Sequence, residues 1–163
     1  MTGANLSIVE YADEHAKAFH DINVEWILSM FVLEDHDREV LENPREFIID
    51  PGGVILLVKS EAHGIVGACA LMKSGEGEYE LTKMGVHETV RGLKAGEFLL
   101  RAVLDRAATM RMTKLYLLTN SKCEAAIHLY KKLGFSHDPA VLREHGGTYA
   151  RSNVAMSFPV MRI

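Results

Sequence analysis

Residues 78–96 read EYELTKMGVHETVRGLKAG and decide how the rest of the chain is arranged. Residues 78–86 have the composition of a strand, and residues 91–96 form a glycine-bearing turn that leads into a helix. The N–H groups in the first turn of a helix have no intrahelical partner, and the helix dipole attracts negative charge there. Because Arg91 and Lys94 add two positive charges, we predict a phosphate or pyrophosphate site at this junction. A glycine turn before a helix is also common without a ligand, so the motif is weak when taken alone.

The composition indicates one globular domain over residues 1–163. Of the 163 residues, 48% are hydrophobic and 25% are charged, which is ordinary for a protein with a sizeable core. The net charge of −4 argues against a nucleic-acid partner, because binding to phosphate backbones needs clustered positive charge. No apolar segment approaches the length of about 20 residues that spans a bilayer, and the N-terminus lacks a secretory-signal pattern. We therefore expect a cytoplasmic protein that binds neither nucleic acid nor membrane.

The cysteines and histidines give no disulfide or metal-binding pattern. Cys69 and Cys123 form no C-x-x-C motif, and Cys69 lies in the apolar run VGACALM, which predicts a core thiol. The eight histidines are scattered. Residues 35–37 (DHD) have no further ligand at a fixed spacing, so we expect no metal site.

The N-terminal third predicts a strand over residues 6–11 and two helices. From Asp13 the apolar residues recur at helical spacing. Trp26 falls on this stripe, and its position predicts a core side chain rather than a ligand contact. A second, short helix with acids in its first turn is expected from Asp35 to Leu41. The stripe of the first helix consists of Phe19, Ile22, Trp26, Ile27 and Met30.

The middle of the chain predicts an antiparallel meander followed by a parallel crossover. Residues 53–60, 63–74 and 78–86 read as three strands separated by turns. After a helix that ends near residue 112, the run KLYLLTN (114–120) is apolar at nearly every position, as in a buried parallel strand. The crossover should be right-handed. It places the turn before the helix at the carboxyl end of a strand, where open α/β sheets bind ligands.

The C-terminal part predicts a helix, a polar loop and a last strand. Residues 122–133 have an amphipathic helical pattern, and Gly134 is expected just past the helix end. Residues 143–147 are expected to form a mobile loop. One long strand is expected within residues 148–160, and its edge is a candidate surface for a homodimer.

Four motifs together resemble the GNAT superfamily of acyl-CoA-dependent N-acetyltransferases. They are ELTKMGV (80–86), RGLKAG (91–96), Asn120 at a strand end, and AAIHLYKKLGF (125–135). The resemblance covers essentially the whole chain. It implies an α/β fold with a mixed sheet of six to seven strands, in which strands one to four form an antiparallel meander, flanked by about four helices. Lys94 stands where the family pattern has a glycine, and a lysine does not adopt positive φ cheaply.

The resemblance also implies acetyl-CoA as the cofactor. In the family, the strands that match 78–86 and 114–119 splay apart, and the pantetheine arm lies between them. This implies main-chain hydrogen bonds from Met84 and Val86, capture of the pyrophosphate by the glycine turn, and a contact from Asn120. The implied cofactor-binding residues are Met84, Gly85, Val86, Arg91, Gly92, Leu93, Lys94, Ala95, Gly96 and Asn120.

Two residues are candidates for proton transfer during acetylation of an amine. Glu80 is the candidate base, acting directly or through a water, because strand alternation places Glu80, Thr82, Met84 and Val86 on one face. The alternative is an ion-paired carboxylate without a catalytic role. Tyr130 is the candidate acid, because the resemblance places a tyrosine here near the cofactor sulfur, and the alternative is a core tyrosine. The Met84 N–H is a candidate oxyanion donor.

These residues predict direct transfer of an acetyl group from acetyl-CoA to a primary amine of a small molecule or peptide, in a ternary complex. An acyl-cysteine route through Cys123 is an alternative that the family does not need. The alternative functions are a non-catalytic acyl-CoA-binding regulatory module and a purely structural domain. Acceptor specificity is expected from residues 13–43 and 137–150. The acids of the first segment, which indicate either a cationic acceptor or a solvated acidic face, are Glu25, Glu34, Asp35 and Asp37.

Overall fold

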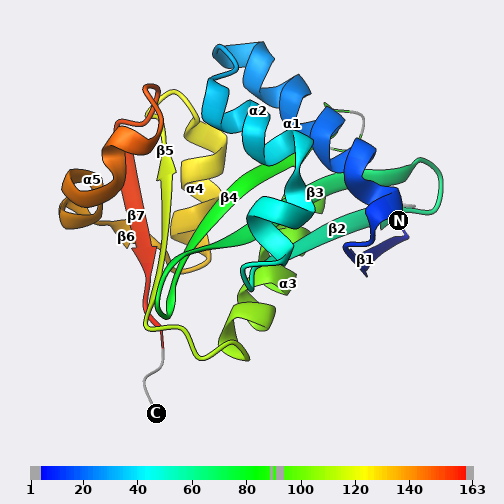
Figure 1. The fold of residues 1–163 in the computed structure, drawn as a ribbon. Coiled ribbons are helices and arrows are strands. Elements are labelled where there is room, and N and C mark those ends of the chain that lie inside the picture. Colours follow the sequence, from blue (N-terminus) through cyan, green and yellow to red (C-terminus); the bar gives the residue numbers. More distant parts are fainter. Residues whose placement is uncertain (1–4, 89, 91–93, 161–163) are drawn as a thin grey trace.

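The computed structural model describes residues 5–88, 90 and 94–160, and within them seven strands form one mixed sheet (Figure 1). The strand order across the sheet is β1-β2-β3-β4-β5-β7-β6. The strands are β1 (Leu6–Glu10), β2 (Val54–Ser60), β3 (Gly64–Gly75), β4 (Glu78–Val86), β5 (Lys114–Thr119), β6 (Ser136–His137) and β7 (Val154–Phe158).

The sheet has the predicted antiparallel meander and parallel crossover. Strands β1 to β4 pair in sequence order, each antiparallel to the one before. Helix α3 (Ala95–Ala108) then leads to β5, which pairs in parallel with β4. Strand β7 pairs with β5 on one side, and β6 pairs with Met156 and Ser157 on the other. Part of the β7 edge that was expected to serve a homodimer is therefore covered, and the dimer stays a prediction.

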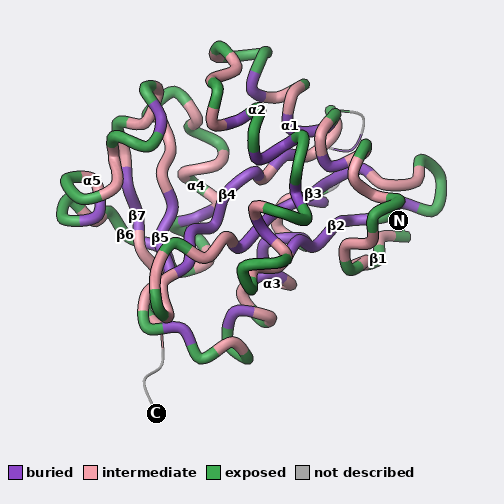
Figure 2. Tube along the Cα trace, in the orientation of Figure 1, coloured by how far each residue is buried: buried purple, intermediate pink, exposed green. Residues whose placement is uncertain are grey.

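Helices cover both faces of the sheet and bury two separate apolar cores (Figures 1 and 2). Helices α1 (Ala16–Met30) and α2 (Asp35–Glu42) pack on one face. Helices α3 and α4 (Glu124–Lys132) pack on the other. No helix in the described part of the chain is both long and apolar enough to cross a membrane. The remaining helical segments are η1 (Asp13–His15), η2 (Arg45–Ile49), α5 (Pro139–His145) and η4 (Gly146–Thr148).

The segment between α4 and β7 is helical where the sequence predicts a mobile loop. Residues 143–147 belong to α5 and η4. Asp138 caps α5 by accepting a hydrogen bond from the Val141 backbone N–H at 3.2 Å, and Pro139 stands at the start of the helix. The last strand spans only Val154–Phe158. The residues just before it therefore approach the sheet as an irregular segment.

A β-bulge at Lys83 interrupts the alternation of β4. Thr82 pairs with Ala70 and Gly85 pairs with Ala68, so β4 contains one more residue than β3 across this step. Lys83 has a φ of 52°, in the left-handed region. Ala68 and Ala70 belong to the core under α1 and α2. Because directly opposed residues share a face of the sheet, Thr82 and Gly85 face α1 and α2 as well.

The bulge shows that the single face predicted for β4 is wrong. Glu80 pairs with Met72, which packs in the core under α1 and α2, so Glu80 shares a face with Thr82. Met84 and Val86 instead pack with the core under α3 and α4. The extra residue reverses the phase of the strand, which a count of alternating positions cannot detect.

Strands β4 and β5 separate beyond the middle of the sheet. Their parallel pairing ends at Leu81 and Leu117. Within the described residues, Leu118 and Thr119 pair further along with β7, whereas the end of β4 pairs with β3. The two facing edges therefore lack ladder partners and enclose a gap.

Candidate active site

A cavity of about 350 Å³ lies at the gap between β4 and β5. Its walls come from the end of α1, the two separating strands, the start of α4 and the irregular segment before β7. The lining residues are Trp26, Ser29–Phe31, Leu81–Met84, Leu118–Asn120, Lys122–Ala126, Tyr130, Tyr149, Arg151 and Ser152.

The cavity has two chemically different sides. On the side of α3 and α4 it is lined by Met84 and Tyr130, which belong to the apolar core of that face. On the side of α1 and α2 it is lined by Thr82, Lys83 and Trp26. Two reacting groups can therefore meet in the gap while each contacts a different face of the sheet.

Tyr130 places a phenol on the α4 side of the cavity. The residue is 8% exposed, and its ring centroid lies 5.7 Å from that of Phe135. Burial raises the pKa of the Tyr130 hydroxyl above its usual range. Among the described residues this hydroxyl has no hydrogen-bond partner. The group therefore stays protonated and can donate a hydrogen bond to an occupant of the cavity.

Glu80 lies behind Thr82 and does not line the cavity itself. The residue is 4% exposed. Burial raises the pKa of Glu80 to about 7, although the charges of Lys83 and Arg151 and the Thr82 side chain oppose this shift. A carboxyl group with this pKa exchanges its proton at neutral pH, as an effective general base must.

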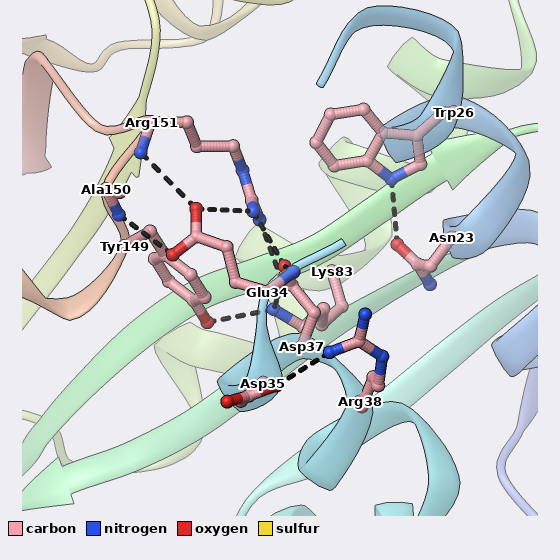
Figure 3. A network of polar contacts seen from close by, with 10 residues as sticks. All are labelled: Asn23, Trp26, Glu34, Asp35, Asp37, Arg38, Lys83, Tyr149, Ala150 and Arg151. Atoms are coloured by element: carbon pink, nitrogen blue, oxygen red, sulfur yellow. Dashed lines mark hydrogen bonds and ion pairs between the residues drawn. The ribbon is translucent and has the colours of Figure 1, made fainter. Parts of the chain in front are cut away.

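A network of buried charges joins α2, β4 and the segment before β7 (Figure 3). Asp37 is fully buried and accepts hydrogen bonds from Lys83 Nζ at 2.9 Å and from both terminal nitrogens of Arg151 at 2.7 and 2.8 Å. Burial alone would raise the pKa of Asp37, but Arg151 and Lys83 hold it well below its usual range. Glu34 accepts further hydrogen bonds from Arg151 at 3.3 Å and from the Ala150 N–H at 2.9 Å.

Tyr149 connects this network to Glu80. Its hydroxyl accepts a hydrogen bond from Lys83 Nζ at 2.8 Å. Burial raises the pKa of Tyr149 above its usual range, so the phenol keeps its proton. The Thr82 side chain lowers the pKa of both Glu80 and Tyr149, so it lies close to both groups. Because Thr82 and Tyr149 line the cavity, their hydroxyls form a polar path from the cavity to the buried carboxyl group.

The predicted phosphate-binding turn is described only in part. Arg91, Gly92 and Leu93 lie outside the described residues. Lys94 precedes α3 with a φ of 60°, so it adopts the left-handed conformation that is costly for a lysine. The family glycine is thus replaced by a residue that keeps the backbone conformation of a glycine and adds a cation.

The start of α3 lies beside the end of β4. Ala95 is buried in the core that α3 and α4 share. A Cβ on Gly96 would lie 3.7 Å from side-chain atoms of Leu129 and Val86 and 3.9 Å from Met84. These contacts place the first turn of α3 next to α4 and to the part of β4 that leaves β5, on the α4 side of the sheet.

Asn120 and Gly85 have packing roles that the sequence did not predict. Asn120 lines the cavity, donates a hydrogen bond to the Arg151 carbonyl at 2.7 Å and accepts one from the Lys122 N–H at 2.8 Å. It thereby joins the end of β5 to the segment before β7. A Cβ on Gly85 would lie 2.5 Å from Trp26 Cδ1, so the glycine allows α1 to pack closely on β4.

The four acids that indicated a cationic acceptor have partners within the protein, and none of them lines the cavity. Glu34 and Asp37 belong to the buried network. Asp35 accepts a hydrogen bond from a neighbouring arginine at 2.7 Å, and Glu25 lies 3.6 Å from a histidine. Glu34 and Asp37 therefore serve the fold, whereas the exposed Asp35 and Glu25 fit the alternative of a solvated acidic face.

Sequence reasoning missed several residues of the site. Trp26 packs against the core under α1 and α2, as expected, but it also lines the cavity, and its indole N–H donates to Asn23 Oδ1 at 2.9 Å (Figure 3). Tyr149 and Arg151 were assigned to a strand that begins after them. Lys83 carried a usable signal, because a lysine within the largely apolar strand LTKMGV must find an anionic partner if it is buried. The acid that pairs with Lys83 is Asp37, which lies 46 positions away, so a local sequence pattern cannot identify it.

The profile of the acetyltransferase (GNAT) family matches residues 10–135 of this chain. An uncharacterised N-acetyltransferase of Schizosaccharomyces pombe is 29% identical over 97 residues, which are 58% of this chain. The match spans 59% of the length of that curated relative.

Solved acetyltransferase structures have the same fold. A GNAT-family acetyltransferase from Staphylococcus aureus superposes with a TM-score of 0.85 at 22% identity, over 96% of this chain and 99% of that one. An acetyltransferase from Streptococcus agalactiae superposes with a TM-score of 0.78 at 18% identity, over 95% of this chain and 98% of that one. At these identities the likeness shows the fold alone.

Proposed function

The chain belongs to the acetyltransferase (GNAT) family, and from this premise we propose that it transfers an acetyl group from acetyl-CoA to a primary amine of a small molecule or peptide, directly within a ternary complex. The observation that carries the proposal is the cavity in the sheet, with Glu80 behind one side and Tyr130 on the other. Acetylation of an amine needs a base for the ammonium group and a proton donor for the leaving thiolate. A non-catalytic acyl-CoA-binding module would need neither group.

The α4 side of the cavity fits a coenzyme A thioester, which supplies the activated acetyl group. The end of β4 has no ladder partner on the β5 side among the described residues, so the backbone groups of Met84, Gly85 and Val86 can pair with the amides of an extended pantetheine arm. Asn120 lies across the same cavity. Its amide has one further donor and acceptor position beyond the two hydrogen bonds it makes within the protein.

The start of α3 fits the pyrophosphate of the same ligand. Lys94 supplies a cation, and the backbone N–H groups of Ala95 and Gly96 lie in the first helical turn, where they have no intrahelical partner. In the proposal, Arg91, Gly92 and Leu93 complete the turn.

Glu80 is the proposed base, and Thr82 delivers the proton to it. Thr82 lines the cavity on the α1 side, while the buried Glu80 carboxylate accepts the proton at neutral pH. Lys83 donates a hydrogen bond to Tyr149, which leaves the Tyr149 hydroxyl proton to point toward Thr82. This order of donors keeps the Thr82 hydroxyl directed at Glu80 before an ammonium group arrives.

Tyr130 is the proposed acid on the opposite side. Its hydroxyl is protonated across the working pH range because burial raises the pKa. The phenol donates a hydrogen bond to the sulfur as the C–S bond breaks, which stabilises the negative charge that develops on the leaving thiolate. In the proposal, the Met84 N–H donates a hydrogen bond to the acetyl oxygen as negative charge develops on it.

Calorimetric titration of the purified chain with acetyl-CoA tests the cofactor assignment. Gly96→Asp should weaken binding at least about tenfold, because it brings a carboxylate against the pyrophosphate. Gly96→Ala is the matched control, since a Cβ at this position meets its neighbours at ordinary contact distances and should leave affinity nearly unchanged.

Release of free thiol from acetyl-CoA across a panel of amines then tests the reaction. Saturable binding together with amine-dependent thiol release supports the enzyme. Saturable binding without release for any amine supports the acyl-CoA-binding module instead. Absence of binding up to millimolar acetyl-CoA contradicts both functions.

A further inference from the structure

The α1 side of the cavity, where the proposed function places the amine, is built from aromatic and apolar side chains. Trp26, Met30 and Phe31 come from the end of α1, and Tyr149 comes from the segment before β7. We call these four residues the acceptor wall. The Trp26 N–H is already donated to Asn23, so Trp26 presents its ring to the cavity rather than a hydrogen-bond donor.

The charges next to the acceptor wall cancel within the protein (Figure 3). Asp37 binds both Lys83 and Arg151, and Glu34 binds Arg151 and the Ala150 N–H. A polyamine needs unpaired carboxylates, and an amino acid needs an unpaired cation for its own carboxylate. Among the described residues next to this wall, Glu34, Asp37, Lys83 and Arg151 are paired with one another. The Glu80 carboxyl group is buried behind the wall and is the proposed base, and Lys122 and Glu124 line the cavity at the start of α4, on its opposite side.

The same apolar character continues outside the cavity. Four large apolar side chains are well exposed in the described part of the chain, and three of them, Leu28, Met30 and Val32, lie at the end of α1. Their exposed fractions are 58%, 42% and 73%. Met30 also lines the cavity, so exposed apolar surface reaches the rim of the site at this residue.

We propose that the acceptor is a small arylalkylamine, that is, a single primary amine joined through a short chain to an uncharged aromatic ring. This inference rests on the proposed function and names the substrate class of its second site. The ring stacks on the acceptor wall, and the amine reaches Thr82. The cavity of about 350 Å³ lies at the lower end of the range for ligand sites and must also hold the thioester end of the cofactor, so its acceptor side has room for no more than one ring and a short chain.

The chain contains a single tryptophan, and this residue belongs to the acceptor wall. Trp26 fluorescence therefore reports occupation of the wall independently of turnover. We would titrate the full chain, in the presence of CoA, with 2-phenylethylamine, with phenylalanine and with spermidine. Phenylalanine is the matched probe, because it adds only a carboxylate to 2-phenylethylamine.

The expected result is a saturable fluorescence change with 2-phenylethylamine at a Kd at least about tenfold below those of the other two probes. With acetyl-CoA, kcat/KM should follow the same order. Spermidine or phenylalanine binding as well as 2-phenylethylamine would overturn the inference. If 2-phenylethylamine binds selectively but no amine releases thiol, the acceptor class stands and the proposed reaction fails.

Two variants test the wall itself, with thiol release as the readout. Trp26→Ala should lower kcat/KM for 2-phenylethylamine about tenfold or more while changing that for ethylamine little, and Trp26→Phe should restore most of the loss. Met30 is partly exposed, so Met30→Glu should fold even if the tryptophan variant does not. It places an unpaired carboxylate on the wall and should shift the ratio of kcat/KM toward spermidine about tenfold. An unchanged ratio in Met30→Glu would contradict the proposed position of the acceptor.

Discussion

The two sides of the cavity differ in how far apart in the sequence their residues lie. The side proposed to bind the cofactor, called here the cofactor half, comprises the end of β4, the start of α3 and α4, and much of it comes from the continuous stretch 78–96. The acceptor half comprises α1, α2, residues 80–83 and the segment before β7. There, Lys83 binds Asp37 across 46 positions and Tyr149 across 66 positions of the chain.

The difference also appears in how each half holds its charges. In the cofactor half, Glu97 pairs with Lys132 and Arg101 at 2.8 and 2.9 Å, and both basic side chains are about half exposed. In the acceptor half, Asp37 and Lys83 are almost fully buried. Exposed pairs are screened by water and contribute little, whereas a buried charge that loses its partner is strongly destabilising. The acceptor half is therefore the part of the site whose shape depends on tertiary contacts.

The largest expected effect is on the rate of acetyl transfer, which in the proposal needs residues from both halves. Glu80→Gln should lower turnover by about 10²- to 10⁴-fold at pH 8, the usual range for losing a general base. Acetyl-CoA affinity should stay unchanged, because Glu80 lies on the acceptor side. In the unmodified protein, kcat should rise as the pH passes through about 7, where Glu80 loses its proton. A variant with near-normal turnover would remove Glu80 from the mechanism.

The buried network gives the next largest effect. Asp37→Asn should lower the free energy of unfolding by about 3 to 5 kcal/mol, because it leaves Lys83 and Arg151 buried beside a neutral amide. Glu97→Gln is the matched change in the cofactor half, and its urea midpoint should barely move. Equal losses of unfolding free energy in the two variants would contradict the difference between the halves. Chemical denaturation at pH 7 measures both.

Glu80→Gln should also be more stable than the unmodified protein at pH 8, by about 3 kcal/mol. The folded-state pKa of Glu80 is raised from 4.5 to about 7, so the folded protein holds the proton more tightly than the unfolded chain does. The resulting stabilisation is complete below pH 4.5 and is lost as the pH rises through about 7. The difference between the two proteins in urea unfolding should therefore grow from pH 5 to pH 8. A difference that is constant with pH would mean that Glu80 is not buried as an acid.

Tyr130→Phe should lower turnover by roughly 10- to 100-fold, because the thiolate would then leave without a neighbouring proton donor. Acetyl-CoA affinity should change little, since the variant keeps the ring that packs against Phe135. This variant tests the cofactor half by itself, because it should lower turnover without altering any residue of the acceptor half. Calorimetry and thiol release on the same preparation separate binding from turnover.

The smallest expected effect compares the two lysines with positive φ. Lys94→Gly should stabilise the fold by about 0.5 to 1 kcal/mol, because a glycine adopts the left-handed region without a Cβ penalty. Lys83→Gly relieves the same backbone cost but removes one of the two cations that pair with the buried Asp37, so it should destabilise. The same sign of the change in urea midpoint for both variants would show that backbone strain outweighs the buried ion pair.

Most of the fold and the cofactor half could be predicted from the sequence. The meander, the crossover and the helices each follow from hydrophobic period and turn residues within a short window. Gly134 has the predicted left-handed conformation, with a φ of 117°. Apart from Asn120, which follows β5, the described residues implied for the cofactor lie at the end of β4 and the start of α3, so their proximity follows from chain connectivity.

The acceptor half could not be predicted in the same way. Local rules did not predict that Trp26 also lines the cavity or that Asp37 is buried, and they put Glu80 and Met84 on one face. Each of these features depends on a contact between distant segments. Gly85 leaves room for Trp26 to pack on β4, and Asp37 pairs with Lys83 and Arg151. The bulge at Lys83 changes which residues of β4 face α1 and α2.

The sequence by itself determined the α/β architecture, the family and the candidates Glu80 and Tyr130. Only the tertiary structure decided which face each candidate occupies and which charges remain for a ligand. The physical reason is that period and turn chemistry act over a few residues. Burial, charge pairing and strand register are instead set by whichever distant groups pack together.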